Sequence, residues 1–337
     1  MILIDALYIN NSGGKVLLDY LVRELENSKI DVNYLFDHRV KYDYALVPNS
    51  RKKYLKPNLY NRINYYRHNK YKYKIIFCFG NIPPFLKTAS TTYVYFHQVL
   101  YLSIPNSTPL RKKILLNLKS IIIYIIRRNT NYWIVQTNTV ADGLQVKFNI
   151  DKCKIKVIPF YPRLSPNIET TRERNHYLYV GDGNPHKNHL RLLDAFERFV
   201  KKINPSAILH LTVTDRFPLL INKINELNKR GVNVFNHGLV KRENLAELYS
   251  KSWYLVYPSL RESFGLGLIE AIENGVKVIG ADLPYTYSVC SPSLVFDPKS
   301  SESIYNSLIA STKSPVNETK LMVNNEIKKM IEILKEK

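Results

Sequence analysis

Residues 257–280, YPSLRESFGLGLIEAIENGVKVIG, carry the clearest indication of how this 337-residue chain folds. The letters predict the end of a strand, a loop, a helix from Leu266 to about Asn274 and a second, buried strand. Gly265 has no Cβ and lies just before the helix, and Gly275 provides a left-handed stop after it. Strand, tight turn, helix and strand in this order are typical of a doubly wound α/β domain.

The turn in this stretch also predicts a binding site for an anion. Backbone N–H groups at Gly265, Leu266 and Gly267 would open the helix, where they and the helix dipole favour a phosphate. Two carboxylates frame the turn, because Glu262 lies in the loop and Glu270 lies about one helical turn beyond Leu266. A carboxylate repels an anion, so its role beside one is best explained as accepting hydrogen bonds from hydroxyl groups. The pattern therefore favours a phosphate flanked by sugars, as in a nucleotide-sugar.

The motif P-S-x-x-E-S-F-G-L-x-x-x-E-A over residues 258–271 strongly resembles the E-x7-E motif of retaining glycosyltransferases of family 4. The resemblance implies the GT-B fold, an α/β architecture of two Rossmann-like, doubly wound domains with a cleft between them. It also implies that Glu262 lies by the transferred sugar and its α-phosphate, and that Glu270 holds the ribose hydroxyls. The turn residues that would line the donor are Phe264, Gly265 and Leu266. The alternative is a chance strand, turn and helix with two solvated glutamates.

A second turn, GDGNPHKN over residues 181–188, follows a predicted strand and precedes a predicted helix. A glycine-rich turn with a lysine at a helix start predicts another anion site, where Lys187 would act as a point charge on a pyrophosphate. The segment resembles the G-R-x4-K-N/G turn of family 4, which implies donor contacts at Gly181, Asp182, Lys187 and Asn188. Asp182 stands where the family usually has an arginine, so Arg216 or Arg261 would have to supply the second cation.

Two features of the first half of the chain match the same family. A strand over residues 2–9 is followed by Asn10-Asn11-Ser12-Gly13-Gly14 and a helix from Lys15 to about Asn27, so Gly13 and Gly14 are expected in a turn that approaches the donor. A strand over residues 92–96 ends immediately before His97, where ligands of open α/β sheets gather. The resemblance implies that His97 bonds a hydroxyl of the transferred sugar. A bare Gly-Gly turn and a satisfied loop histidine are the alternatives.

At 337 residues the chain is too long for one ordinary core and is expected to form two domains, and the alternation of strands and helices supports the doubly wound class. We expect an acceptor-binding domain over residues 1–160, a proline-rich linker over 161–175 and a nucleotide-sugar-binding domain over 176–315. Residues 316–337 are expected to form a closing helix that crosses back to the first domain, as the resemblance implies. Residues 44–48 are a weaker candidate for a further strand of the first domain.

The net charge of +21 is placed unevenly. Residues 1–165 hold 26 Lys and Arg against 9 Asp and Glu, and no acidic residue lies between Asp43 and Asp142. Such a field attracts an anionic membrane surface or a nucleic acid, although compositional bias of the genome also raises lysine content. The segment 110–128, LRKKILLNLKSIIIYIIRR, predicts a helix that lies at a membrane interface or packs in the core. Residues 51–74 interleave nine Lys and Arg with tyrosines, and we favour a helix on the sheet over a nucleic-acid site.

Other classes of site are disfavoured by what the sequence lacks. Cys78, Cys153 and Cys290 have no metal or redox spacing, which predicts buried thiols in a reducing compartment. No D-x-D motif is present, and His186 with His189 has no third ligand nearby, so neither a metal nor another cofactor is expected. No apolar run reaches the roughly 18 residues of a membrane span, and no signal peptide is evident. We expect a cytoplasmic protein at the inner face of the cytoplasmic membrane.

Taken together, the sequence predicts a metal-independent glycosyltransferase that moves a sugar, with retention, from a nucleotide-sugar to a glycan or lipid-linked acceptor. Surface polysaccharide or lipopolysaccharide assembly is the expected context, and His97, Lys187 and Glu262 are the expected catalytic residues. The alternative is a non-catalytic protein of the same shape that binds a polyanion or a protein partner.

Overall fold

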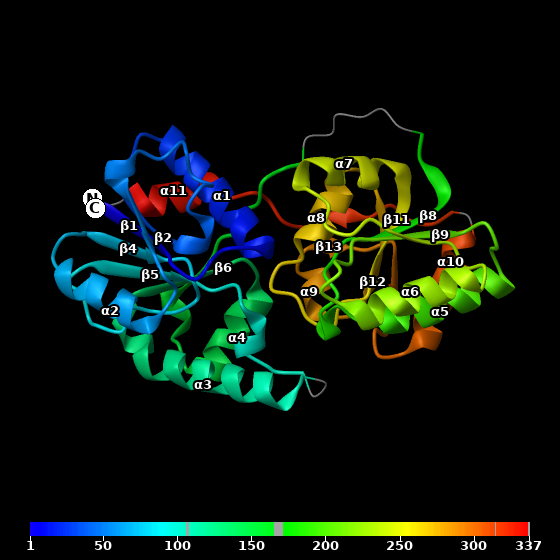
Figure 1. Cartoon of the computed structure of the whole chain (residues 1–337), viewed down its shortest axis with the longest axis horizontal. Coiled ribbons are helices and arrows are strands. Elements are labelled where there is room, and N and C mark those ends of the chain that lie inside the picture. The colour runs from blue at the N-terminus through cyan, green and yellow to red at the C-terminus, as the bar shows by residue number, and fades with distance from the viewer. Residues whose placement is uncertain (106–107, 165–170, 314, 336–337) are drawn as a thin grey trace. The chain divides into compact units, whose positions relative to one another are not determined.

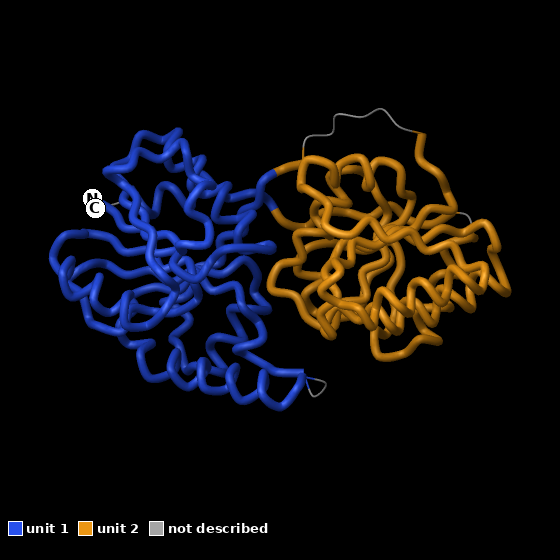
Figure 2. The backbone as a smooth tube through the Cα atoms, viewed as in Figure 1, with its two compact units in different colours: residues 1–162, 324–337 blue, residues 163–323 orange. Residues whose placement is uncertain are grey.

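The computed structural model describes residues 1–105, 108–164, 171–313 and 315–335, and the chain forms two compact units (Figure 1, Figure 2). Unit 1 comprises Met1–Pro162 and Asn324–Lys337, and unit 2 comprises Arg163–Val323. Each unit is built on one parallel sheet, so the predicted α/β class with two Rossmann-like sheets is confirmed. The middle of the expected linker, residues 165–170, lies outside the described residues.

The sheet of unit 1 has seven parallel strands in the order β3-β2-β1-β4-β5-β6-β7. Its central strands are runs of apolar side chains that are buried on both faces, as parallel sheets require. The strands are β1 (Ile2–Ala6), β2 (Val32–Asp37), β3 (Lys52–Leu55), β4 (Ile75–Cys78), β5 (Thr91–Tyr95), β6 (Tyr132–Val135) and β7 (Ile155–Val157).

Five α-helices cover the two faces of this sheet. Helices α1 and α11 lie on one face, and α2, α3 and α4 lie on the other (Figure 1). The second face carries a core in which Tyr66 of α2, Ile123 of α3 and Leu144 of α4 join side chains of the strands. The helices are α1 (Ser12–Asn27), α2 (Leu59–His68), α3 (Leu110–Ile126), α4 (Asn138–Phe148) and α11 (Ile327–Lys335).

Unit 2 has a six-stranded parallel sheet in the order β10-β9-β8-β11-β12-β14 and a separate antiparallel pair, β13 with β15. Helices α5, α6 and α10 lie on one face of the large sheet, and α7 and α8 lie on the other (Figure 1). The strands are β8 (Glu173–Tyr179), β9 (Ile208–Leu211), β10 (Val234–Asn236), β11 (Ser252–Tyr257), β12 (Lys277–Ala281), β13 (Cys290–Ser291), β14 (Leu294–Phe296) and β15 (Lys320–Leu321). The helices are α5 (His189–Lys202), α6 (Pro218–Lys229), α7 (Arg242–Lys251), α8 (Leu266–Glu273), α9 (Pro284–Tyr287) and α10 (Ser301–Thr312).

The strand order reverses once in each sheet, between β1 and β4 in unit 1 and between β8 and β11 in unit 2. At such a point the loops that leave two neighbouring strands run to opposite faces, which opens a crevice at their carboxyl ends. In unit 2 these loops are residues 180–188 and 258–265, which contain both predicted phosphate turns. In unit 1 the corresponding loops follow β1 and β4.

Several predicted boundaries are wrong, each for a local reason. Residues 44–48 form turns and not a strand, because Tyr44 is buried by stacking on Phe36 with 3.9 Å between ring centroids. The closing helix begins only at Ile327, since β15 pairs with β13 in the segment where the helix was expected to start. Strand β8 begins at Glu173, inside the expected linker.

The cysteines and the basic segment 51–74 also differ in part from expectation. Cys78 and Cys290 are buried, whereas Cys153 is exposed, so the prediction of three buried thiols is wrong for one of them. Within α2, Arg62 points inward and not to solvent, and its Nε donates to the buried carboxylate of Asp5 at 2.8 Å. The tyrosines Tyr65 and Tyr66 pack on the sheet as predicted.

Candidate active site

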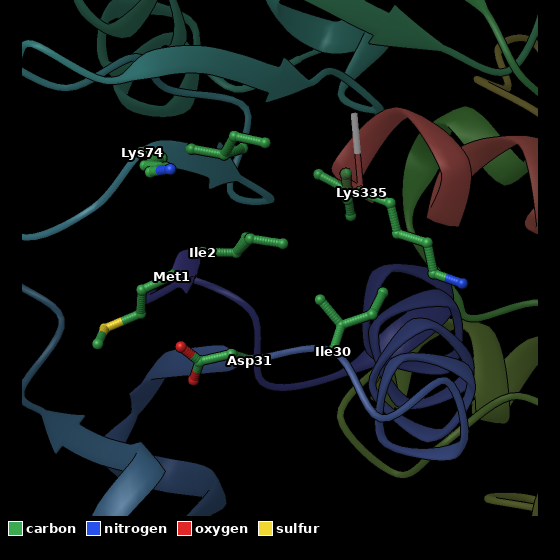
Figure 3. Close-up of a pocket in the computed structure, with 8 residues that line it drawn as sticks. Met1, Ile2, Ile30, Asp31, Lys74 and Lys335 are labelled. Atoms are coloured by element: carbon green, nitrogen blue, oxygen red, sulfur yellow. The ribbon is translucent and has the colours of Figure 1, made fainter. Parts of the chain in front are cut away.

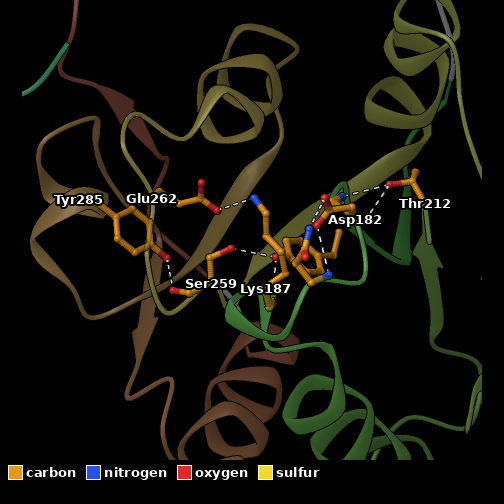
Figure 4. A network of polar contacts seen from close by, with 9 residues as sticks. Asp182, Lys187, Thr212, Ser259, Glu262 and Tyr285 are labelled. Atoms are coloured by element: carbon orange, nitrogen blue, oxygen red, sulfur yellow. Dashed lines mark hydrogen bonds and ion pairs between the residues drawn. The ribbon is translucent and has the colours of Figure 1, made fainter. Parts of the chain in front are cut away.

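The loop after β8 and the loop after β11 are joined to each other at the switch point of unit 2. The N–H of Leu260 donates to the carbonyl oxygen of His186 at 2.8 Å. The hydroxyl of Tyr179 donates to the carbonyl of Lys187 at 2.9 Å and lies 2.8 Å from Ser259 Oγ (Figure 4). These buried bonds fix the two predicted phosphate turns as one structure.

Lys187 and Glu262 form the centre of this structure. Lys187 Nζ donates to Glu262 Oε1 at 2.7 Å, and both side chains are mostly buried (Figure 4). Lys187 ends a short 3-10 turn over Pro185–Lys187, and Glu262 comes from the loop after β11. Two side chains 75 residues apart in sequence are therefore brought together by the fold. Each side chain of this pair offsets the charge of the other.

Helix α8 begins as predicted. Gly265 is its N-cap residue with φ +81°, a left-handed conformation that favours glycine, and Gly275 follows the helix with φ +70°. The first turn of α8 contains no acidic residue, so its free N–H groups retain their positive end charge. Phe264 is buried and packs in the interior, so its side chain serves the fold and only its backbone is available to a ligand.

Glu270 lies one turn into α8, and α7 holds its carboxylate. Arg242 Nη1 donates to Oε1, and the hydroxyl of Tyr249 donates to Oε2 at 3.2 Å. The Glu270 side chain is only 6% exposed. Burial raises the pKa of Glu270, and the guanidinium of Arg242 opposes that rise.

The remaining residues of the turn after β8 serve mainly to shape it. Asp182 accepts from the backbone N–H of Asn184 at 3.2 Å and from its side-chain amide at 2.6 Å, which folds the turn on itself. Asn188 has φ +63°, and its buried amide donates to the carbonyls of Pro258 and Pro298. Gly181 donates its N–H to Thr212 Oγ1 at 3.0 Å (Figure 4).

The two candidate replacements for the arginine absent at position 182 have different surroundings. Arg216 Nε reaches Thr214 Oγ1 at 3.5 Å, which keeps it close to the end of β9. Arg261 lies between Leu260 and Glu262, both of which contact the Lys187 turn. Burial lowers the pKa of Arg261. Such a shift is typical of a cation that lacks an anionic neighbour.

In unit 1, His97 lies at the carboxyl end of β5 beside the switch point. Its N–H donates to Asn81 Oδ1 at 2.6 Å, and its ring Nε2 is 3.2 Å from both Asn81 Nδ2 and the carbonyl of Phe79. Burial lowers the pKa of His97 to about 4, so the ring is neutral near pH 7. A neutral imidazole suits hydrogen bonding to a hydroxyl group better than charge stabilisation.

Gly13 and Gly14 do not form the turn that was predicted. They lie in the first turn of α1, because Asn11 is the N-cap residue and its carbonyl accepts from the N–H of Lys15 at 3.3 Å. Gly14 nevertheless makes a close approach, since a Cβ at this position would lie 2.8 Å from His97 Cε1. The Gly13-Gly14 segment and His97, which the sequence analysis treated as separate features, thus lie next to each other in the fold.

Sequence reasoning missed Arg242, Tyr249 and Asn81. Arg242 and Tyr249 are seven residues apart, a spacing that puts both on one face of a helix. This spacing was the sequence pattern that could have indicated them. Asn81 directly follows Gly80 at the end of β4 and has φ +68°, a conformation that asparagine tolerates better than most residues.

Other parts of the molecule show less chemistry. A hollow of about 190 Å³ opens at the amino ends of β1 and β4, lined by Met1, Ile2, Ile30, Asp31, Lys74 and Lys335 among others (Figure 3). It lies at the end of the sheet opposite His97.

Within the described ranges, no group of three His, Cys, Asp or Glu side chains could hold a metal ion, and no helix is long and apolar enough to cross a bilayer.

Comparisons with known proteins place this site in a family. The O-antigen chain mannosyltransferase RfbU of Salmonella typhimurium strain LT2 is 31% identical over 173 residues, which cover 51% of this chain and 48% of RfbU. The chain thus spans about half the length of this curated relative. Among solved structures, WaaG, a glycosyltransferase of lipopolysaccharide biosynthesis, has a TM-score of 0.72 at 15% identity over 94% of this chain and 91% of its own. The Anabaena protein HepE, solved with UDP and glucose, has a TM-score of 0.70 at 13% identity, covering 93% and 90%.

These likenesses confirm the GT-B fold that the motif predicted, with both parallel sheets included in the match. A family model described as "Glycosyl transferases group 1" matches residues 162–330. This segment is half of the chain and contains Lys187, Glu262 and Glu270. The chain therefore belongs to the family of group 1 glycosyl transferases.

Proposed function

We propose that unit 2 binds a nucleotide-sugar and that the protein transfers the sugar to an acceptor with retention of anomeric configuration. The observation that carries this proposal is the pairing of Lys187 with Glu262, next to the start of α8 in the sheet crevice. Lys187 and the N–H groups of α8 bind the diphosphate, and they stabilise the charge that develops on it as the sugar leaves. Glu262 then turns from Lys187 to the sugar, and Glu270 holds the ribose.

Arg261 supplies the second cation at the diphosphate in place of the arginine that position 182 lacks. Its sequence neighbours are tied to the Lys187 turn, and burial lowers the pKa of Arg261 with no opposing contribution from a nearby carboxylate, which a bound anion would supply. In this proposal, side chains and backbone N–H groups make all the contacts to the donor, and the transfer needs no metal ion.

The donor sugar is proposed to be mannose, and the context is proposed to be O-antigen or another surface polysaccharide. The supporting observation is the likeness to RfbU, an O-antigen chain mannosyltransferase. His97 of unit 1 is proposed to bond a hydroxyl of the transferred sugar, since its half-buried ring is held neutral and contacts the Asn81 amide through Nε2.

The acceptor is proposed to be a lipid-linked glycan at an anionic membrane surface on the cytoplasmic side. Support comes from α3, which exposes a stripe of large apolar side chains at helical spacing: Leu110, Ile114, Leu118, Ile121 and Ile125. Arg111 and Lys112 at one end and Arg128 beyond the other are exposed as well. Exposed apolar patches of this kind mark interaction surfaces, and flanking cations suit the headgroups of anionic lipids.

The donor proposal is tested by thermal unfolding and calorimetry of the purified protein with UDP-, GDP-, TDP- and ADP-sugars, GDP-mannose included, with and without EDTA. Linkage predicts about 2.7 kcal/mol of stabilisation at a ligand concentration 100-fold above Kd. We expect a shift with one nucleotide that EDTA leaves unchanged, and weaker binding by Glu270→Ala. No binding of any of these donors, with or without an acceptor lipid, would contradict the proposal.

A further inference from the structure

Helix α7 presents two side chains to the buried carboxylate on α8. Arg242 is the first residue of α7 and Tyr249 lies two helical turns later on the same face. Arg242 bonds one oxygen of Glu270, and Tyr249 bonds the other at 3.2 Å. Tyr249 is fully buried, whereas the Arg242 side chain remains 27% exposed.

A carboxylate in this position is not explained by stability. Among the described residues, Glu270 is the one buried glutamate, and an ion pair in such a place is often replaceable by apolar side chains without loss of stability. An ionised carboxylate has about four acceptor positions, two on each oxygen. One bond from Arg242 and one from Tyr249 leave about two positions, which equals the number of hydroxyls in a vicinal diol.

We propose that Arg242 is a positioning residue that keeps Glu270 ionised and aimed, so that the carboxylate accepts hydrogen bonds from both hydroxyls of the donor's ribose. This inference rests on the proposed function, because it takes a nucleoside diphosphate as the ligand of unit 2. It adds that recognition of the ribose depends on a cation from another helix, and that Tyr249 fixes the second oxygen.

The charges around Glu270 support this role for Arg242. Glu273 lies on the same helix and is paired with Arg163, so its charge is offset. The strands packed on α8 contribute Lys277 and Lys320, of which Lys277 is paired with Glu318 at 2.8 Å. Burial raises the pKa of Glu270, while Arg242 and then Tyr249 lower it. Without Arg242 the pKa rises further, so the carboxyl binds a proton as the pH falls and loses acceptor positions.

The test compares a nucleoside diphosphate with its 2′-deoxy form, using calorimetry on the full-length protein between pH 5.5 and 8.5. The wild type should bind the ribose form more tightly by about tenfold, because one charge-assisted hydrogen bond is lost in the deoxy form. This ratio should change little with pH. In Arg242→Gln the ratio should fall towards one at low pH and recover as the pH rises, and Arg242→Lys should retain part of the preference.

Arg198→Gln is the matched control, because Arg198 also pairs with a glutamate of unit 2, Glu302, at 2.6 Å but at an exposed site. It should leave the ratio and its pH profile unchanged. If Arg242→Gln does not fold, Tyr249→Phe removes a single hydroxyl and should shift the ratio in the same direction by less.

Three results would overturn the inference, and they are distinguishable from one another. An Arg242→Gln protein that unfolds more easily but keeps the wild-type ratio at every pH would show that the residue is only structural. If the wild type binds nucleoside diphosphates but does not prefer the ribose form, the ribose hydroxyls do not bind Glu270. The proposed function would still stand. A wild type that binds no nucleoside diphosphate would overturn the proposed function itself, and the inference with it.

Discussion

At the scale of single residues, the ion pair between Lys187 and Glu262 occupies the charged group of each side chain. The two atoms are 2.7 Å apart and mostly shielded from water. In the proposed reaction, a diphosphate that takes over Lys187 also releases Glu262, which becomes available to hydroxyls of the sugar. Donor binding and the preparation of Glu262 are then one event.

Lys187→Ala is therefore expected to lower kcat by about 100-fold or more, the usual cost of losing one charge-stabilising group at the reacting centre. The measurement is steady-state transfer with a fixed acceptor. Lys201→Ala is the matched control, because Lys201 also bonds a glutamate at 2.7 Å but on the exposed side of α5. Equal kinetics of the two variants would remove Lys187 from the reaction.

The same scale shows what could be predicted from the sequence. Glu262, Glu270 and Lys187 could be predicted as site residues because each belongs to a local turn motif that is recognisable from the neighbouring residues. Arg242 was not found, because its partner Glu270 lies 28 residues away on another helix. The approach of Gly14 to His97 was missed for the same reason, since only the folded sheet brings their elements together.

At the scale of elements, α3 is apolar on two sides, and only one of them is used by the fold. Leu116, Ile123 and Ile126 are buried, while the stripe that contains Leu118 and Ile125 faces solvent. The sequence predicted both a core helix and an interfacial helix for this segment. Both descriptions agree with the buried and exposed faces, and the lipid partner remains to be tested.

Leu118→Gln with Ile125→Gln should reduce binding to vesicles that contain anionic lipid, because less apolar surface enters the interface. Flotation measures the bound fraction, and circular dichroism should show an unchanged fold since both side chains are exposed. Leu219→Gln is the control, as Leu219 is 85% exposed on α6 of unit 2. If the double variant floats as the wild type does, α3 does not contact the membrane.

At the scale of the whole molecule, histidines whose pKa is lowered by partial or full burial make stability depend on pH. Burial lowers the pKa of His97 to about 4 and of His210 to about 4, and burial with Lys187 lowers that of His189 to about 3. The unfolded chain has ordinary histidines that titrate near pH 6.5. Between about pH 6.5 and 4 the unfolded chain thus binds more protons, so the free energy of unfolding falls as the pH is lowered.

We expect urea midpoints that are constant above about pH 7 and decrease steadily towards pH 4.5. The shift for His97 corresponds to a loss on the order of 3 kcal/mol once the pH is below its folded pKa. His210→Asn should flatten the profile of unit 2, whereas His68→Asn, at an exposed position of α2, should not change it. A midpoint that does not vary with pH would contradict the burial of these rings.

The connectivity of the two units affects how related genes can exchange a domain by recombination. Unit 2 is, in gene terms, an insertion between Pro162 and Asn324, because the last helix belongs to unit 1. That helix buries Ile327, Met330 and Leu334, and Asn325 beside it bonds the hydroxyl of Tyr20 on α1. A recombination event with one breakpoint would replace α11 together with unit 2. The new α11 would then pack against the original α1, and the side chains at their interface would not match. Two breakpoints exchange the whole of unit 2, so if unit 2 binds the donor as proposed, new donor specificities are expected to spread between genes as internal segments.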